Sequence, residues 1–205
     1  MDIATAIGSV FAAFGLSGAA GLNAWIPLFA TGLLDRLGAI DLASPYSDLS
    51  STPALIIMGA GLVLDFVGDK VPTVDHVLHV AGTVIAPVSG AVVFIAQTGT
   101  HTEIPPVASL LIGSAVSGSF HAGRSALRPV STATTAGVGN PILSLIEDVT
   151  SVALTVLAVV APILAFLLVV AALVALAVSF RSLRRRWKAR RAAKAAAAAG
   201  APPGG

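Results

Sequence analysis

The sequence has 205 residues, of which 56% are hydrophobic and only 11% are charged. Soluble domains carry about 25% charged residues, so this composition excludes an ordinary water-soluble domain. Cysteine is absent, which excludes disulfides and thiolate metal sites. The net charge of +2 is divided unevenly, because residues 1–180 hold four basic and ten acidic side chains, whereas residues 181–194 hold eight basic ones.

The first hydrophobic segment is too long for one straight transmembrane helix. Residues 3–34 carry no charge, and at about 1.5 Å per residue they would form about 48 Å of helix against about 30 Å of hydrocarbon. Glycine and alanine crowd positions 15–21, and Asn23 and Pro27 follow. Such features break or kink helices. We expect a spanning helix and then a second segment, spanning or re-entrant, that ends at Leu34.

A polar loop separates this segment from the next helix. Residues 35–52 contain three aspartates and several serines. Thr52-Pro53 is a suitable helix start, and the helix that follows reaches the carboxylate of Asp65 after about 18 Å. We expect a charged junction from there to His79, and then an apolar segment, residues 80–97, that is long enough to span.

The second half of the chain also alternates apolar segments with charges. Pro105-Pro106 predicts the start of a helix that is apolar as far as His121. A short apolar run, residues 142–146, ends at a glutamate and an aspartate. A long uncharged stretch, residues 149–180, is interrupted by Pro162.

These patterns predict an all-α, polytopic helical membrane protein with two parts. Residues 1–180 form a membrane domain of six to eight short hydrophobic segments, some of them broken or re-entrant. Residues 181–205 form a basic tail, in which we expect order to end at about Lys194.

The basic tail predicts contact with the membrane surface. It directly follows a long apolar segment, which favours anionic lipid headgroups over nucleic acid as its partner. The same charge places the C-terminus in the cytoplasm. Met1-Asp2 lacks the positive n-region of a signal peptide, so we expect uncleaved, multi-pass insertion into a bacterial inner membrane or its equivalent. The residues expected to anchor the tail are Arg184, Arg185, Arg186 and Trp187.

The two halves of the chain, about residues 11–98 and 105–179, resemble each other weakly. Residues 20–27 and 122–129 share four identities and a small polar residue in register. Paired, interrupted hydrophobic segments are typical of transporters built from internal repeats. We expect a duplication, which is inverted if each copy crosses the membrane an odd number of times.

Four sequence blocks carry a resemblance to a known family. They are Ser-Gly-Ala-Ala-Gly-Leu-Asn-Ala at residues 17–24, Leu-Asp-Phe-Val-Gly-Asp-Lys-Val-Pro at 64–72, His-Ala-Gly-Arg at 121–124, and Asn140-Pro141 followed by Ser-Leu-Ile-Glu-Asp at 144–148. With these blocks, the sequence resembles a bacterial membrane family catalogued as domain of unknown function 4126. The resemblance covers most of residues 11–165. It implies a polytopic helical membrane protein and supplies no activity.

Charged residues within the apolar segments form the candidate site. An ionised side chain in hydrocarbon costs about 2.5–3.5 kcal/mol even on the lenient insertion scale, so such residues should be paired or face a wet cavity. Asp65 and Asp69 share a helix face at a spacing of four, and so do Arg124 and Arg128 in the other half. We expect acids and bases of the two halves to pair around a central polar site. The candidate pathway residues are Asn23, Asp65, Asp69, Lys70, His121, Arg124, Glu147 and Asp148.

Some of these charges have a simpler interpretation. Asp69 and Lys70, with Asp75 and His76, fit helix ends at the membrane surface, where they would only set topology. His76 and His79 lie three residues apart, but a divalent metal needs at least one more ligand. His121 or Glu147 could supply it, although the site that we expect contains no metal and no other cofactor.

Together, these features favour a small transporter or channel-like permease that moves an ion or small solute between the two halves. The alternative is a non-transporting scaffold or accessory subunit that binds a partner protein or lipid. An enzyme is not expected, because the sequence lacks a Gly-x-Ser-x-Gly elbow, a P-loop and a His-Glu-x-x-His motif. A lipid-modifying enzyme has only the carboxylate pairs in its favour. The many small residues suit close helix packing and a homo-oligomer.

Overall fold

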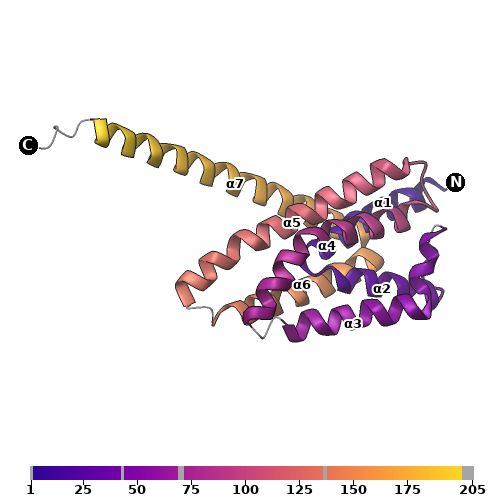
Figure 1. Cartoon of the computed structure of the whole chain (residues 1–205). Coiled ribbons are helices and arrows are strands. Elements are labelled where there is room, and N and C mark those ends of the chain that lie inside the picture. Colours follow the sequence, from indigo (N-terminus) through magenta and orange to yellow (C-terminus); the bar gives the residue numbers. More distant parts are fainter. Residues whose placement is uncertain (1, 43, 69–71, 136–137, 200–205) are drawn as a thin grey trace, which may run out of the picture.

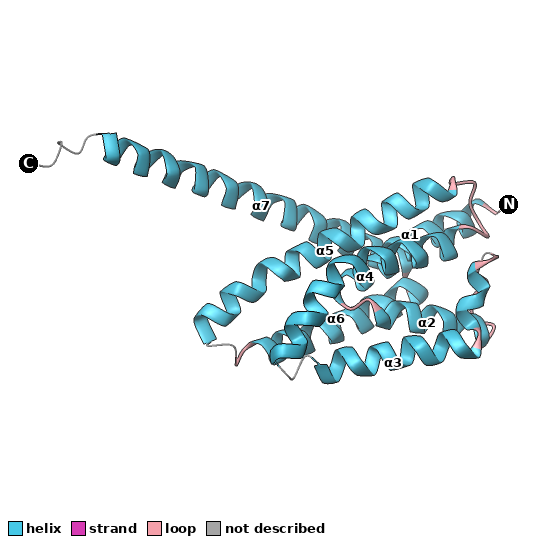
Figure 2. Ribbon diagram, in the orientation of Figure 1, coloured by secondary structure: helices cyan, strands magenta, loops and turns pink. Residues whose placement is uncertain are grey.

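The computed structural model describes residues 2–42, 44–68, 72–135 and 138–199, with the backbone alone for residues 72, 73, 75, 76 and 193–199. Every regular element in these ranges is a helix (Figure 2). The seven α-helices of this part of the chain fall within the expected six to eight segments. They are α1 (Ile3–Leu22), α2 (Trp25–Arg36), α3 (Thr52–Gly68), α4 (Pro72–Thr98), α5 (Pro106–Thr135), α6 (Asn140–Val160) and α7 (Pro162–Ala199), with a 3-10 turn η1 (Tyr46–Ser50) before α3.

The surface of the bundle is apolar. Four helical stretches of the described chain are long and apolar enough to cross a membrane, namely α1, α6, Val77–Thr98 of α4 and Pro162–Ala192 of α7. Large aliphatic side chains such as Ile56, Val149 and Leu167 are exposed. So much exposed apolar surface is unfavourable in water and suits lipid. The chain is a polytopic helical membrane protein.

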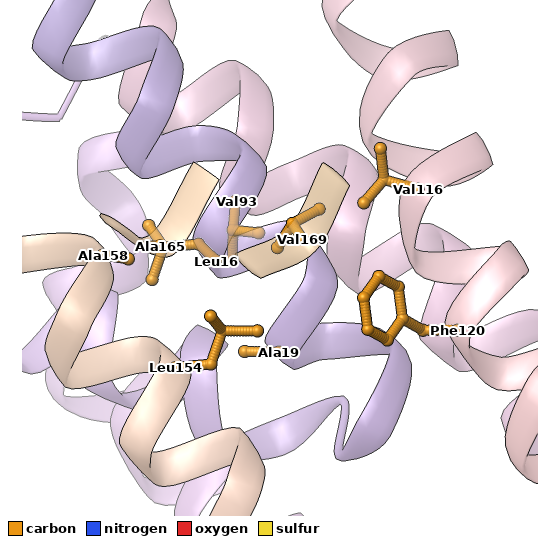
Figure 3. Close-up of a cluster of buried hydrophobic side chains, with 9 residues drawn as sticks. All are labelled: Leu16, Ala19, Val93, Val116, Phe120, Leu154, Ala158, Ala165 and Val169. Carbon is orange, nitrogen blue, oxygen red and sulfur yellow. The ribbon is translucent and has the colours of Figure 1, made fainter. Parts of the chain in front are cut away.

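Helix α1 lies in the middle of the bundle and packs against α4, α5, α6 and α7 (Figure 1). A cluster of buried apolar side chains joins these five helices (Figure 3). Leu16 and Ala19 of α1 are 2% and 0% exposed, and they are surrounded by side chains of the other four helices. The cluster consists of Leu16, Ala19, Val93, Val116, Phe120, Leu154, Ala158, Ala165 and Val169.

Small residues let the neighbouring helices approach α1 closely. A Cβ atom on Gly15 would lie 2.8 Å from the Cβ of Ala158, and one on Gly18 would lie 2.7 Å from Val169 Cγ2. A Cβ on Gly21 would collide with Phe120 and with the carbonyl oxygen of Ser117. Small residues at such contacts are typical of packed transmembrane helices.

Buried serines hold helices together through backbone carbonyls. Ser17 Oγ donates to Gly90 O at 2.9 Å, and Ser117 Oγ donates to Ala86 O at 2.6 Å. Ser151 Oγ of α6 donates to Ala19 O of α1 at 3.0 Å. These three hydroxyl groups thus have hydrogen-bond partners inside the apolar bundle.

The expected break in the first segment is confirmed. Helix α1 ends at Leu22 and α2 begins at Trp25, and the N-terminus and the α2–α3 connection lie at the same end of the molecule (Figure 1). The chain therefore enters the bundle along α1 and returns along α2. The tip of this hairpin is Asn23, which is 1% exposed.

Three expected boundaries differ from the structure. Glu147 does not end a short segment but lies inside the continuous helix α6, because two arginines compensate its charge. The charged junction expected from Asp65 is helical up to Gly68 and again from Pro72. The basic tail remains helical to Ala199, beyond Lys194, as the high helix propensity of alanine favours.

We predict that Gly21→Ala destabilises the bundle, because the added methyl group has no room against α5. Overpacking of this kind costs about 1–3 kcal/mol, so the melting temperature of the detergent-solubilised protein should fall by several degrees. Gly8→Ala is the matched control on the same helix, since nothing lies within 4 Å of its new Cβ. Equal melting temperatures of both variants would contradict the close contact between α1 and α5.

Candidate functional site

The break between α1 and α2 is organised by the side chain of Asn23. Its Nδ2 donates to Asp65 Oδ2 of α3 and to Asp148 Oδ1 of α6, both at 2.8 Å. Its Oδ1 accepts hydrogen bonds from the backbone nitrogens of Trp25 at 3.0 Å and Ile26 at 3.3 Å. The amide thereby caps the start of α2 and uses both of its donors and its acceptor.

The end of α1 is compensated by an arginine. Arg124 Nη1 of α5 donates a hydrogen bond to the carbonyl oxygen of Leu22. The last carbonyl groups of a helix lack partners within the helix and carry partial negative charge. A guanidinium group at this position therefore stabilises a helix end that is buried in the bundle.

The same arginine forms an ion-pair network with α6. Arg124 Nε lies 3.2 Å from Glu147 Oε2, although the angle is not that of a hydrogen bond and Nε has no other partner among the described residues. Arg128 NH2, one turn further along α5, lies 3.5 Å from the same oxygen. All three side chains are at most 11% exposed. All members of this network belong to the second half of the sequence, so it is not the predicted pairing of charges between the two halves. The halves are joined by the amide of Asn23 and by the Leu22 carbonyl.

The described part of the site contains more acid than base. Its three carboxylates are those of Asp65, Glu147 and Asp148, and its two guanidinium groups are those of Arg124 and Arg128. The oxygens of Asp65 and Asp148 that share the Asn23 nitrogen can be no more than twice 2.8 Å apart. At an effective dielectric constant of about 20, two full charges at that separation repel by about 3 kcal/mol.

A small cavity adjoins these charges. It has a volume of about 130 Å³ and lies between the α1–α2 break, α3, α4 and α5. Its polar lining comes from Asp65, His121 and Arg124, and Trp25 and Gly82 also border it. At about 30 Å³ per molecule, this volume has room for about four waters.

His121 is the least satisfied side chain of the cavity. It is 5% exposed, and neither ring nitrogen has a hydrogen-bond partner among the described residues. Its ring stacks on that of His79 of α4 with 5.2 Å between centroids. A Cβ on Gly82 would lie only 2.8 Å from His121 Cε1, so glycine at this position makes room for the imidazole. A buried imidazole whose nitrogens have no hydrogen-bond partner among the described residues is rare, so His121 is a candidate binding residue of the cavity.

Polar atoms continue from the site along one face of α6. Asn140, Ser144 and Glu147 follow one another at spacings of four and three, and each contains a buried oxygen without a partner in the described structure. Ser151 and Thr155 extend the same face in the other direction. The stripe thus runs along α6 from its first residue, past the ion pairs, and into the core beside α1.

The contact between α5 and α7 fixes the depth of the site. Gly123, next to Arg124, lies against Leu176 of α7, because a Cβ there would be 2.6 Å from Leu176 Cδ2. Arg181, the first charge of α7, follows five residues later, which is about 8 Å along a helix. The site therefore lies within the apolar part of the bundle but near the end from which the basic tail extends.

The structure brings together most of the predicted pathway residues. Asn23, Asp65, His121, Arg124, Glu147 and Asp148 all belong to the site or its cavity. Asp69 and Lys70 lie outside the described residues. No group of three metal-binding side chains occurs among the residues that the structure describes, and His79 contacts His121 instead of forming a described metal site.

Sequence reasoning missed several participants. Arg128 was recognised by its spacing from Arg124 but was not included among the pathway residues, although it shares the Glu147 carboxylate. The Leu22 carbonyl, Trp25 and Ser144 were also missed. The polar spacing of α6 could have indicated Ser144, whereas no local signal identifies a carbonyl as a partner of an arginine.

We predict that Arg124→Met destabilises the protein by about 3–5 kcal/mol, because breaking a buried ion pair leaves an uncompensated charge. The free energy of unfolding can be measured by denaturant titration in mixed micelles. Arg36→Met is the control, since Arg36 is exposed and donates to the hydroxyl of Thr52; it should cost less than about 1 kcal/mol. A similar cost for both variants would show that the Arg124 network contributes no special stability.

The chain was also compared with known proteins. No curated protein and no solved structure matches it significantly. The model of one protein family, described as "Domain of unknown function (DUF4126)", matches residues 10–182, which include the whole site and all of the membrane part except its first helical turns. The chain belongs to the DUF4126 family.

Proposed function

We propose that this protein is a small membrane transporter or channel-like permease that moves an ion or small solute through the polar site at the α1–α2 break. The observation that carries the proposal is the cavity of about 130 Å³ beside Asp65, Arg124 and His121, whose ring nitrogens have no hydrogen-bond partner in the described part of the chain. Charges that only set topology belong at the membrane surface, where water solvates them. Ionised side chains inside an apolar bundle are costly, and a pathway gives them a use.

The surroundings of the site support access from the tail side. In that direction, the polar face of α6 offers oxygens of Glu147, Ser144 and Asn140 that have no partner among the described residues and could bind water or a passing solute. In the other direction, the core cluster around Leu16 and Phe120 is closed. Transport then requires these packed side chains to separate. The α1–α2 hairpin is the natural moving part, because its tip carries Asn23.

The same proposal includes the orientation of the chain in the membrane and its internal repeat. The positive charge of the tail supports a cytoplasmic C-terminus in a bacterial inner membrane or its equivalent. The helices long and apolar enough to cross are then α1, α4, α6 and α7. A broken helix whose ends face buried charge is typical of transporters, and the proposed internal repeat would pair the segments around Asn23 and Ser125. Ser125 lies within the continuous helix α5, so the two copies would have diverged at the break.

The second candidate is a scaffold that binds a partner protein or lipid, or forms a homo-oligomer. It is favoured by the long helical tail, which extends away from the bundle (Figure 1) and carries Arg184, Arg185, Arg186 and Trp187. A scaffold has no need for ionised groups around a cavity and should tolerate neutral substitutes there. This difference separates the two candidates.

We predict that Asp65→Asn and Glu147→Gln each lower flux in proteoliposomes at least tenfold while the protein still folds, which corresponds to about 1.4 kcal/mol on the barrier. The assay measures the uptake of protons, sodium, potassium and chloride under imposed gradients. Asp48→Asn is the control, because Asp48 is exposed in the α2–α3 connection. Unchanged flux in the first two variants, or no flux of any tested ion by the parent protein, would favour the scaffold.

We also predict that removal of residues 181–205 leaves flux per inserted molecule unchanged but randomises orientation. Each basic residue near an anionic membrane surface contributes about 1 kcal/mol to membrane binding. Deletion of the tail therefore removes the charge that keeps the C-terminal end of the bundle on one side of the membrane. Protease protection of an N-terminal tag measures orientation. A truncated protein that inserts as uniformly as the parent would show that the tail does not set topology.

A further inference from the structure

We propose that an apolar groove on the side of the bundle, between α3 and α6, binds amphipathic ammonium compounds from the membrane, with the ammonium head group at Asp148 and the apolar tail along the groove. Naming these compounds as the transported solute rests on the proposed function, whereas their binding in the groove does not.

The groove lies where two helices stay apart. Helix α2 packs against both α3 and α6, whereas the described residues of α3 and α6 make no close backbone contact with each other (Figure 1). The groove has a volume of about 610 Å³, within the range of about 300–1,000 Å³ that is usual for ligand pockets. Its walls include Ile26 of α2, Val63 and Phe66 of α3, and Val149 and Val152 of α6. Val63 and Val149 are 63% and 61% exposed, so the groove opens toward the lipid.

A single acidic side chain borders this groove. Among the described residues that line it, Asp148 is the one that is not apolar. It lies three residues after Leu145 and four before Val152, which also line the groove, so the three share one face of α6. The preceding residue, Glu147, belongs instead to the polar face of α6 inside the bundle. The groove therefore offers apolar walls and one carboxylate.

The two adjacent acids of α6 have different partners. Two guanidinium groups approach Glu147 Oε2, at 3.2 Å and 3.5 Å, whereas Asp148 Oδ1 accepts a hydrogen bond from the neutral amide of Asn23 at 2.8 Å. A carboxylate in apolar surroundings is costly, and a charged donor stabilises it about twice as well as a neutral one. An ammonium head group at Asp148 supplies such a charge, and the apolar walls suit a hydrocarbon tail.

The depth of the groove favours a simple ammonium compound over a phospholipid or a metal ion. Asp148 follows Glu147 in the chain and therefore lies at the depth of the site, within the apolar part of the bundle. A phospholipid amine at this depth would draw its phosphate group into the hydrocarbon, and no basic side chain occurs among the described residues that line the groove. Divalent metal ions prefer several oxygen ligands, whereas the groove offers one carboxylate.

The groove and the polar cavity meet at Asn23. Its amide nitrogen donates to Asp148, which borders the groove, and to Asp65, which borders the cavity. A head group held at Asp148 is therefore one side chain away from the site of the proposed transport. The groove would serve as a lateral entrance from the lipid.

The experiment uses the full-length protein and hexyltrimethylammonium, whose positive charge does not depend on pH. In micelles of a neutral detergent, scintillation proximity measures binding of the tritiated compound. The competitors are hexanol, hexanoate, tetramethylammonium and phosphatidylethanolamine. In proteoliposomes of phosphatidylcholine and phosphatidylglycerol, uptake of the same compound is measured beside uptake of protons, sodium, potassium and chloride.

Two variants separate the head-group site from the tail site. Asp148→Asn removes the charge and keeps an oxygen that can accept from Asn23. Val152→Phe fills the groove from a position that is 48% exposed. The matched controls are Asp48→Asn, in the α2–α3 connection, and Ile146→Phe, at an exposed position of α6 outside the groove.

We expect the parent and both controls to bind hexyltrimethylammonium at least tenfold more tightly than any of the four competitors. Asp148→Asn and Val152→Phe should each lose at least tenfold in affinity. Equal competition by hexanol, hexanoate or tetramethylammonium would overturn the inference, because head group and tail would not both be recognised. Equal competition by phosphatidylethanolamine would overturn it in favour of a bilayer lipid. A changed particle mass of Val152→Phe would overturn it in favour of an interface between copies of the chain.

The transport measurement separates this inference from the proposed function. Binding with the expected pattern, but without uptake of the compound or of any tested ion, would support the groove and contradict the transport function. Uptake of an inorganic ion by a parent protein that does not bind hexyltrimethylammonium would overturn the inference and leave the transport function standing.

Discussion

The hydrogen bonds of Asn23 are the contacts on which the rest of the structure depends. One amide nitrogen holds the carboxylates of Asp65 and Asp148 at 2.8 Å, so that α3 and α6 meet at the tip of the α1–α2 hairpin. Its oxygen caps α2. A helix break inside an apolar bundle is tolerated only where its polar groups find partners, and here one side chain supplies most of them.

The two helix ends at this break explain the distribution of charge around it. The carbonyl end of α1 attracts the guanidinium of Arg124, and that arginine in turn requires Glu147. The amide of Asn23 gathers two more acids. The result is a group of five ionisable side chains among the described residues, next to a cavity that His121 borders. The residues that satisfy the polar groups of the helix break are therefore also the residues that give the site its chemistry.

The sequence predicted those features of the fold that depend on neighbouring residues alone. The small residues before Asn23, and Pro27 after it, predicted the break, and the charge-free lengths predicted a membrane bundle. Length and hydropathy alone treated Glu147 as a helix end, because the compensation by Arg124 and Arg128 comes from another helix. The eight predicted pathway residues included six that converge, yet no pattern indicated the cavity. At its border, Gly82 and Gly61 make room for the rings of His121 and Trp25, which depends on the packing of four helices.

The most direct measurement for this account is a double-mutant cycle between Asn23 and Asp148. The free energies of unfolding of Asn23→Leu, Asp148→Leu and the double variant are compared with that of the parent. If the amide is the central junction, the double variant costs less than the two single variants together, with a coupling of about 1–3 kcal/mol. Additivity within about 0.3–0.5 kcal/mol would show that the two side chains do not depend on each other, and the break would then need another explanation.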